Sequence, residues 1–228
     1  MKKVLSALCA LALISCTWNV HIGNGKNGKT LTCKGPVVTR TFDLVDFNAI
    51  LINGHADLEF TQTDGTFGVS VTANEEVFQH LNYRVENGTL ILETINKVNI
   101  RADEYDICIS APALTSIEVN GATDTKIAAL NQPGNLEMEI NGAGDMELKN
   151  ITVPELSVEI NGAADLECKG LNVGKLSIEV NGAGDVELSG KAQSCTLNVS
   201  GAGDIDARQL DCEAIETHKA GLASIKTK

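Results

Sequence analysis

A five-residue phrase that recurs in the second half of the chain constrains the fold more than any other feature. It reads Asn-Gly-Ala-Gly-Asp at 141–145, and related copies begin at Asn120, Asn161, Asn181 and Ser200. The first residues of these copies lie 21, 20, 20 and 19 positions apart. A looser copy occupies residues 53–57. A period near twenty residues, with strand-like segments between turns, is typical of a solenoid that adds one β coil per repeat.

The segments between these corners alternate apolar and polar residues, which predicts β-strands. Aligning the copies sorts the apolar residues into columns: Ile140, Ile160, Val180 and Val199 in one, Met138, Val158, Ile178 and Leu197 in the next, and Met146, Leu166, Val186 and Ile205 across the corner. Coils stacked about 4.8 Å apart would join these rows into a continuous core. The sequence therefore predicts an all-β solenoid with about 20 residues per coil.

The corner phrase has a structural explanation. Glycine permits backbone angles that other residues avoid, so the chain can turn sharply in each coil. We expect the corner asparagines to stack into an amide ladder in which each side chain donates to the next carbonyl. We expect the closing aspartate to accept backbone N–H bonds. This structural role is the favoured interpretation of the motif.

The same repetition creates columns of carboxylates, which are the candidate functional residues. Stacked like charges repel, and calcium relieves such repulsion because it takes several oxygen ligands. The candidate calcium ligands are Asp145, Asp165, Asp185 and Asp204. The candidate binding surface consists of outward glutamates: Glu139, Glu159 and Glu179 on one strand, and Glu147, Glu167 and Glu187 on the next. Screening by solvent ions is favoured over calcium, and no other cofactor is expected.

The charge balance bears on the partners. The 228 residues include 18 basic and 30 acidic side chains, which give a formal net charge of -12. Binding to phosphate backbones needs clustered Lys and Arg. Nucleic acid is therefore excluded as an expected partner.

The first residues indicate export. Lys2 and Lys3 precede an apolar run, 4–14, that is too short to span a bilayer permanently. The run ends in Leu-Ile-Ser-Cys, which resembles a bacterial lipobox, so we expect removal of a signal peptide, 1–15, and lipid attachment at Cys16. A plain secretory signal is the alternative. Lipid chains would hold the protein on a membrane, and the Gly- and Asn-rich segment 16–36 is predicted to be a flexible tether.

The folded domain is predicted to have two parts, residues 37–112 and 113–228. The first contains short alternating strands separated by turn signals. One signal is Asn87-Gly88, whose residues suit the positive φ angles of a two-residue type I′ hairpin turn. Asn74 is predicted to cap a short helix. The second part holds the regular coils.

These features together resemble one family. The segment from Arg40 through 47–50, the hairpin 85–90 and the Gly-Ala-x-Asp corners are similar to the head GIN domain family, adhesin-like proteins common among lipoproteins of Bacteroides-type bacteria. The resemblance covers about 38–225. It implies a right-handed parallel β-helix-like solenoid, entered through a less regular, partly antiparallel amino-terminal region. It also implies a cell-envelope protein and supplies no catalytic residues.

The sequence contains 7 cysteines. After loss of Cys9 with the signal peptide and use of Cys16 for lipid, an odd number remains, which predicts no complete disulfide framework. Cys168, Cys195 and Cys212 align with apolar columns and are expected to be core residues. Whether Cys33 pairs with Cys108 stays open.

The favoured function is a non-catalytic, adhesin-like module that binds a glycan or a protein through its acidic surface. It would be an outer-membrane lipoprotein of the cell envelope, facing either side. The alternatives are a polysaccharide-degrading β-helix enzyme and an architectural protein that assembles with its own copies. The open end of the solenoid leaves a monomer and an end-to-end homodimer as the two expected states. Paired carboxylates are what a glycosidase needs, but carboxylates that recur in every coil are already explained by the repeat, so no catalytic residue is assigned.

Overall fold

The structure, a computed structural model, describes residues 30–228. The predicted signal peptide, the lipidation site Cys16 and most of the predicted tether lie outside the described residues. The described chain is nearly all β: a two-stranded sheet, one large mixed sheet of 13 strands that stays open, and the short 3-10 helices η1 (Glu75–His80) and η2 (Ile95–Lys97). Within residues 30–228, no helix is long and apolar enough to cross a membrane.

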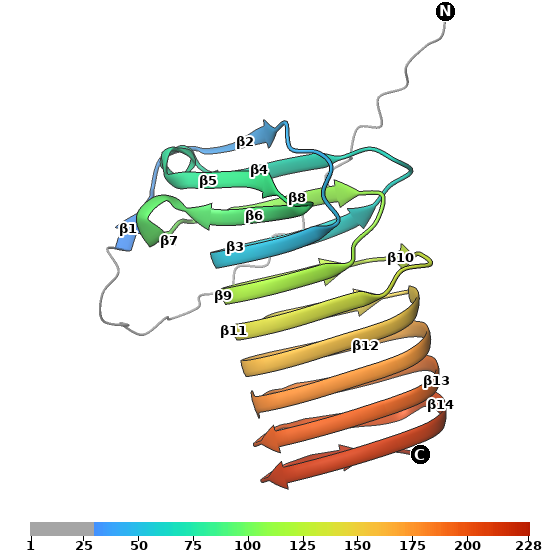
Figure 1. Ribbon diagram of the computed structural model, residues 1–228. Coiled ribbons are helices and arrows are strands. Elements are labelled where there is room, and N and C mark those ends of the chain that lie inside the picture. The colour runs from blue at the N-terminus through green and yellow to red at the C-terminus, as the bar shows by residue number, and fades with distance from the viewer. Residues whose placement is uncertain (1–29) are drawn as a thin grey trace, which may run out of the picture.

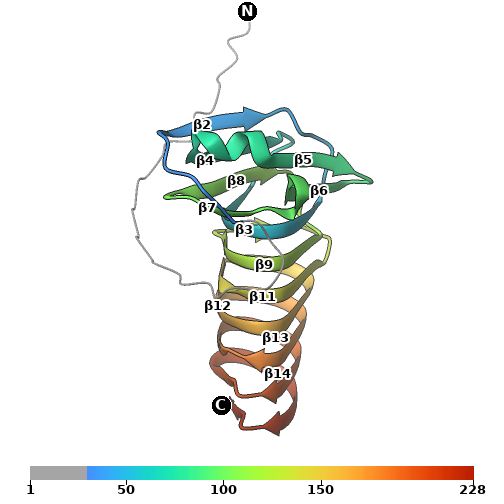
Figure 2. The same ribbon diagram turned by 90° about the vertical axis from the view of Figure 1, so that its left-hand side faces the viewer.

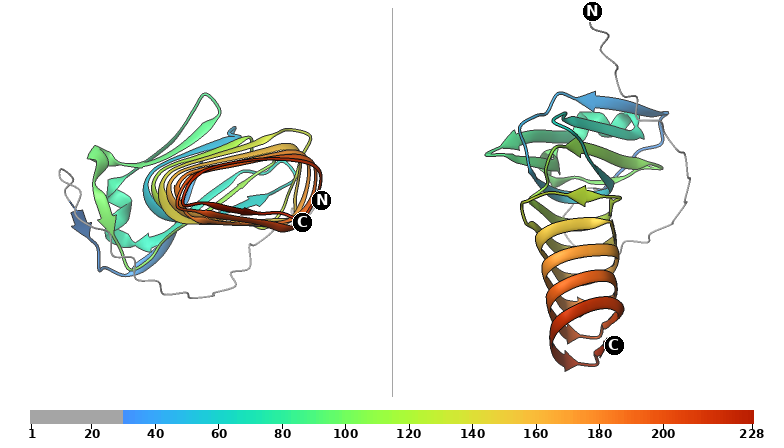
Figure 3. Two further views of the ribbon diagram at one scale, coloured as in Figure 1. Left: turned by 90° about the horizontal axis from the view of Figure 1, so that it is seen from below. Right: turned by 90° about the vertical axis from the view of Figure 1, so that its right-hand side faces the viewer.

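The second half of the chain winds into a stack of flattened coils (Figures 1 and 2). Viewed along the stack, successive coils lie over one another (Figure 3). Parallel pairing joins the long strands β9 (Ser116–Ile127), β11 (Leu136–Lys149), β12 (Ile151–Ala183), β13 (Asp185–Gly201) and β14 (Asp204–Gly221). The short strands β10 (Leu130–Asn131) and β15 (Ser224–Lys226) pair in parallel with β12 and β14.

The motif sets the register of these coils. Asn141 lies opposite Asn120 on one side and Asn161 on the other, and Asn181 lies opposite Ser200. Each strand therefore pairs with the chain one motif earlier and one motif later. Equivalent residues of successive motif copies therefore lie side by side in neighbouring coils.

The first half forms a head that covers one end of the stack (Figure 2). β3 (Ala49–Gln62) carries the looser motif and pairs in parallel with β9, so that Asn53 lies opposite Asn120. Along its other edge, β3 pairs in parallel first with β6 (Thr89–Thr94) and then with β8 (Tyr105–Ala111). Antiparallel pairing joins β4 (Gly68–Asn74) to β8 and to β2 (Val37–Phe42), and joins β5 (Leu81–Glu86) to β6. The head is thus partly antiparallel.

Two local predictions in the head meet different outcomes. Asn87 and Gly88 both have positive φ, 51° and 79°, in the turn between β5 and β6, which confirms the hairpin. A helix does follow Asn74, but it is 3-10 and the Asn74 side chain does not cap it. Instead the buried Asn74 amide donates to the carbonyl of Gly35 at 2.7 Å and accepts from the backbone N–H of Asp103 at 2.8 Å. The predicted cap is wrong because tertiary partners take its polar atoms.

The tether boundary also needs correction, since the described part of 16–36 belongs to the fold. β1 (Thr30–Thr32) pairs in parallel with β7 (Asn99–Arg101). The next residue, Cys33, is 1% exposed, and its N–H donates to the carbonyl of Arg101 at 2.8 Å. The prediction of a tether is therefore wrong for the described residues from Thr30 onward, and the rest of 16–36 lies outside the described residues.

The predicted apolar columns are confirmed as a continuous core. All twelve residues assigned to the three columns are buried. One row contains a polar exception: Thr125 lies between Leu58 and Met146, is fully buried, and its hydroxyl has no hydrogen-bond partner in the described structure. A buried hydroxyl without a partner costs free energy.

The cysteines depart from the predicted arrangement. Cys168 is buried as expected, and burial raises the pKa of its thiol. Cys195 is buried in the core as predicted, and Cys212 packs partly buried against it. The two also form a disulfide that was not predicted, which joins β13 to β14 with their Cα atoms 6.7 Å apart. Cys33 and Cys108 are not bonded to each other. The last full coil is therefore tied covalently to the coil before it.

The glycine column at the corner allows the coils to stack. Gly162 has φ of +157°, and a Cβ atom there would lie 2.0 Å from the carbonyl oxygen of Gly142 in the preceding coil. The corresponding distances at Gly142 and Gly182 are 1.8 and 1.9 Å. No side chain fits at such an approach, so the second position of the motif must be glycine.

We expect Gly162→Ala to destabilise the fold by at least about 3 kcal/mol, because both the strained φ and the backbone clash must be relieved. Urea unfolding would measure this loss. Ala163→Ser, at the exposed neighbouring position, is the control and should change stability by less than about 0.5 kcal/mol. Equal effects of the two substitutions would contradict the close-approach argument.

We expect Thr125→Val to raise the free energy of unfolding by about 1 kcal/mol, because the isosteric methyl group removes an unpartnered buried hydroxyl. The measurement is again the urea midpoint. Thr196→Val, on the outer side of β13, should have little effect. A loss of stability at Thr125 would show that its hydroxyl has a partner.

Candidate binding surface

An asparagine ladder runs along one side of the coils. The Nδ2 atom of each asparagine donates to the Oδ1 atom of the asparagine one coil earlier, at 3.1 Å in each step. The ladder joins Asn53, Asn120, Asn141, Asn161 and Asn181. This confirms the predicted amide ladder and extends it into the head.

Each of the later asparagines also holds a glutamate. Nδ2 donates to the Oε1 atom of the glutamate two residues earlier on the same strand, at 2.8 Å in three coils and 3.0 Å in the fourth. We call these four residues the glutamate strip: Glu118, Glu139, Glu159 and Glu179. One oxygen of each carboxylate is fixed by the ladder, so the four carboxylates have the same orientation in successive coils.

The ladder begins at an ion pair in the head. Glu93 lies opposite Asn53 on β6 and accepts hydrogen bonds from Arg84 Nη1 at 2.6 Å and from Asn82 Nδ2 at 2.8 Å. The hydrogen bond from Arg84, with help from Asn82 and Asn53, lowers the pKa of the Glu93 carboxyl. Sequence reasoning missed this start, because neither Glu93 nor Arg84 belongs to a repeat.

The second glutamate column is different, because cations accompany it. Glu147 and Glu167 form ion pairs with Lys149 and Lys169, two residues further along the strand. In the last coil Asp206 pairs with Arg208 in the same way. Glu187 forms no ion pair with a described residue, but after the hydrogen bond to Glu167 its charge helps to raise the pKa of Lys169. The hydrogen bond from Lys149 lowers the pKa of the Glu147 carboxyl. In residues 30–228 the glutamate strip has no such ion pair, so the two predicted columns are not equivalent.

The aspartate column has a structural use. The Oδ1 atom of Asp124 accepts the backbone N–H of Asp145 at 2.9 Å, and that of Asp165 accepts the N–H of Asp185 at 2.8 Å. Asp204, at the end of the column, lies 3.5 Å from Lys226 Nζ. The predicted acceptor role is thus present, although the bond runs between coils. Across residues 30–228, no group of three or more His, Cys, Asp or Glu side chains is arranged to hold a metal ion.

The aspartate column continues into the head. Asp57 lies opposite Asp124 on one side and opposite Asp106 of β8 on the other. Burial, with the nearby charges of Asp57 and Glu104, raises the pKa of the Asp106 carboxyl to about 6, against the opposing effect of Lys126. Burial and the charges of Asp124 and Asp165 also raise the pKa of Asp145. Asp106 lies outside every motif copy, so the repeat gave no signal for it.

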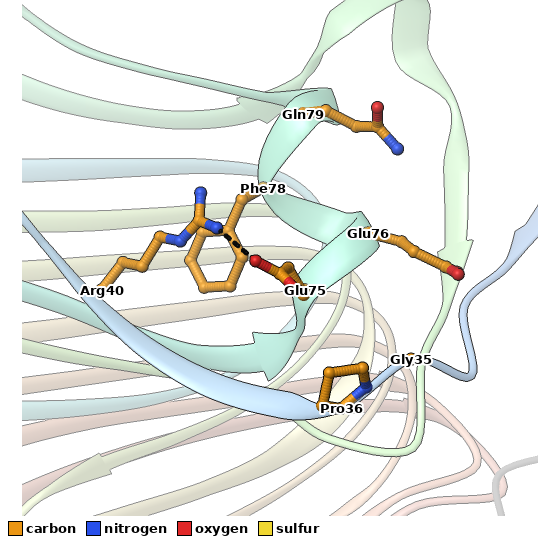
Figure 4. A pocket seen from close by; sticks show the side chains of 7 residues that line it. All are labelled: Gly35, Pro36, Arg40, Glu75, Glu76, Phe78 and Gln79. Atoms are coloured by element: carbon orange, nitrogen blue, oxygen red, sulfur yellow. Dashed lines mark hydrogen bonds and ion pairs between the residues drawn. The ribbon is translucent and has the colours of Figure 1, made fainter.

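An open pocket of about 420 Å³ lies at the far end of the head (Figure 4). Arg40 lines it, forms an ion pair with Glu75 at 3.0 Å, and places its guanidinium 4.6 Å from the centre of the Phe78 ring. Gly35 and Pro36 form the opposite wall. The cation is already paired with a carboxylate and an aromatic ring, so these contacts fasten η1 to β2. The pocket is not continuous with the glutamate strip.

A family model described as "Putative auto-transporter adhesin, head GIN domain" matches residues 46–228. The chain belongs to this family. The resemblance drawn from the corner phrase and the hairpin is thereby confirmed. A search of curated proteins finds no match.

Several solved structures share the fold. A putative adhesin from Bacteroides fragilis is similar over 87% of this chain and 100% of its own, with 18% identity and a TM-score of 0.66. A putative adhesin from Parabacteroides distasonis covers 88% of this chain and 100% of its own, with 15% identity and a TM-score of 0.54. A putative lipid binding protein from the same species covers the same shares at 22% identity and a TM-score of 0.52. The family and these structures carry no enzyme name.

We expect Asp106→Asn to stabilise the protein at pH 8 by about 1–2 kcal/mol and to have little effect at pH 4. Because the pKa of Asp106 is about 6 when folded and 3.8 in the reference state, the ionised form is disfavoured by folding. The penalty is absent below pH 4 and accumulates as pH rises to 6. Melting temperatures across this range test it. Asp64→Asn, on an exposed loop, is the control, and a parallel pH profile for both variants would contradict the prediction.

Proposed function

We propose that this protein is a lipid-anchored module of the cell envelope that binds a partner, without catalysis, on the glutamate strip. We also propose that its coils form a right-handed parallel β-helix. The observation that carries it is the contrast between two acidic columns. One is accompanied by lysines and an arginine, whereas the strip holds its carboxylates in a row with no paired cation in the described chain.

The chemistry of the strip favours a protein partner with a basic, extended surface. Like charges about one coil spacing apart, near 4.8 Å, repel and gain from a cationic ligand. The asparagine ladder fixes one oxygen of each carboxylate, so the ligand meets an array that is already ordered. Preorganisation of this kind reduces the entropy lost on binding.

A glycan is the second candidate, because the strands of the strip also present hydroxyl groups. Ser116, Ser157 and Ser177 lie two residues before Glu118, Glu159 and Glu179 on the same strands. Alternating hydroxyl, carboxylate and amide groups offer both donors and acceptors to sugar hydroxyls. No observation favours the enzyme alternative, since carboxylates that recur in every coil are explained by the repeat.

The proposed location rests on two independent features. The lipobox-like sequence that ends at Cys16 supports an outer-membrane lipoprotein. The disulfide between Cys195 and Cys212 supports an oxidising compartment outside the cytoplasm, where such bonds persist. The adhesin names of its relatives agree with an envelope or surface position.

The test replaces all four glutamates of the strip by glutamine, which keeps an oxygen for each asparagine and removes the charge. We expect this variant to lose at least about tenfold in affinity for a decalysine peptide at low ionic strength. Fluorescence anisotropy would measure the affinity. The matched control is the triple variant Glu147→Gln, Glu167→Gln and Glu187→Gln, which removes nearly as many charges from the lysine-accompanied column and should lose much less.

The two variants distinguish a site from general acidity. Equal losses would contradict a specific role for the strip. A glycan array probed with the unmodified protein and the strip variant tests the second candidate. Sugar binding that is lost with the strip variant, together with no preference for the basic peptide, would replace the protein partner by a glycan.

A further inference from the structure

The last coil leaves an open strand edge. β14 pairs with β13 along most of its length, but on its other side only Asp204–Asp206 is paired, with β15. In the described chain, the outer edge of 207–221 has no strand partner. An unpaired edge of this length is a template for pairing with another strand.

The inward side chains of this strand occupy the last positions of the apolar columns. Ile215, Thr217 and Lys219 follow Cys195, Leu197 and Val199, which are all buried. Ile215 is 37% exposed, and Leu222 at the next corner is 90% exposed. The end of the stack therefore combines exposed apolar groups with two polar groups in positions that are apolar in the preceding coil.

The head limits how two copies can pair through this edge. The other end of the coil stack is not available, since β3 already uses its outer edge for β6 and β8. A head-to-tail fibre would also place Lys219 against a buried apolar row. Pairing of the same edge in two copies about a two-fold axis closes after two chains, whereas pairing of β14 with the open outer edge of β2 in the head would continue as a fibre.

We propose that the edge is the interface of a two-fold dimer in which residues 214–220 of two copies pair antiparallel, with Thr217 opposite itself. In this register Glu216 lies opposite the partner's His218, and the relation occurs twice. Glu216 and His218 already share one face, since His218 Nε2 lies 2.9 Å from Glu216 Oε1 within one chain. On the inner face, Ile215 lies against the carbon stem of the partner's Lys219.

Neighbouring registers lose this complementarity. Residues opposite each other in an antiparallel pair point to the same face, so inner residues must meet inner residues. Moving the two-fold axis by one residue toward Ile215 places Glu216 opposite itself, which brings like charges together. Moving it toward Lys219 places His218 opposite itself and leaves Glu216 opposite Ala220. Only the axis at Thr217 pairs both groups.

The disulfide between Cys195 and Cys212 holds this edge in place. Cys212 lies just before the segment 214–220 and is bonded to Cys195, whose own register partner is Ile215. The bond fixes the last coil on β13 at the point where the interface begins. An edge held in this way loses less conformational freedom on pairing than a frayed one.

The experiment is sedimentation equilibrium from micromolar to millimolar concentration, on the chain carrying Cys16→Ser to remove the proposed lipid. We expect the mass to rise to that of two chains and to stop there. His218→Glu should weaken the dimer by at least about tenfold, because Glu216 then faces a second carboxylate. Adding Glu216→His to that variant exchanges the two groups and should restore the dimer.

Glu137→His is the matched control, since Glu137 is an exposed glutamate on the outer side of β11, away from this end. It should leave the mass profile unchanged. Three results would overturn the proposal: a monomer at every concentration, growth beyond two chains, or a double variant that stays as weak as His218→Glu alone. Because both substitutions are exposed, equal melting temperatures should show that the variants remain folded.

Discussion

The close approach of backbones at the glycine corner is the constraint on which the structure depends. The carbonyl oxygen of Gly142 occupies the space that a Cβ of Gly162 would need, and the same contact recurs from coil to coil. With no side chain at this position, successive coils can keep the same register through their corners. Asparagines then fall above asparagines and carboxylates above carboxylates. The ladder and the acidic columns are consequences of one packing contact.

Stacking identical residues helps amides and harms carboxylates. An asparagine both donates and accepts, so a column of asparagines satisfies itself. A column of carboxylates only accepts, and each member repels the next. Three kinds of contact stabilise the carboxylates. Lysines form ion pairs with Glu147 and Glu167, and backbone N–H groups donate to Asp124 and Asp165. Asparagine amides donate to the glutamate strip. The lysines neutralise charge, whereas N–H groups and amides bind a carboxylate oxygen and leave its charge in place, and only the amides hold every carboxylate of their column in the same orientation.

The parts of the fold that could be predicted from the sequence are those that repeat. Ile140, Ile160 and Val180 share a buried column because they share a motif position, and the ladder of Asn141 and Asn161 follows from the same alignment. Residues outside the repeat obey tertiary contacts that no local pattern records. Asn74 looked like a helix cap but binds Gly35 and Asp103. Asp106 joins the aspartate column from β8, a strand without the motif.

The disulfide shows a second limit of the alignment. Cys212 lies opposite Ala192 and not opposite Cys195, so the register alone keeps the two cysteines in different columns. The coil changes direction between residues 192 and 195, where the inward positions are separated by three residues instead of two. This corner brings the two sulfur atoms together across neighbouring coils. Aligning the repeats compares only equivalent positions, so it cannot predict a bond between residues on the two sides of a corner.

The position of the first described strand gives the stack a direction. β1 and Cys33 are fastened to β7 in the head, so the chain enters the fold at the head end (Figure 1). If Cys16 carries the proposed lipid, the head is the part of the described chain that is nearest to the anchor in sequence, with 13 residues between Cys16 and Thr30. The glutamate strip runs along the coils from β9 to β12, and the open edge of β14 lies beyond it, at the end of the stack away from the head (Figure 1). The strip and the open edge therefore lie on the coils, away from the point where β1 is fastened to β7, so the attachment of the chain's entry to the head obstructs neither.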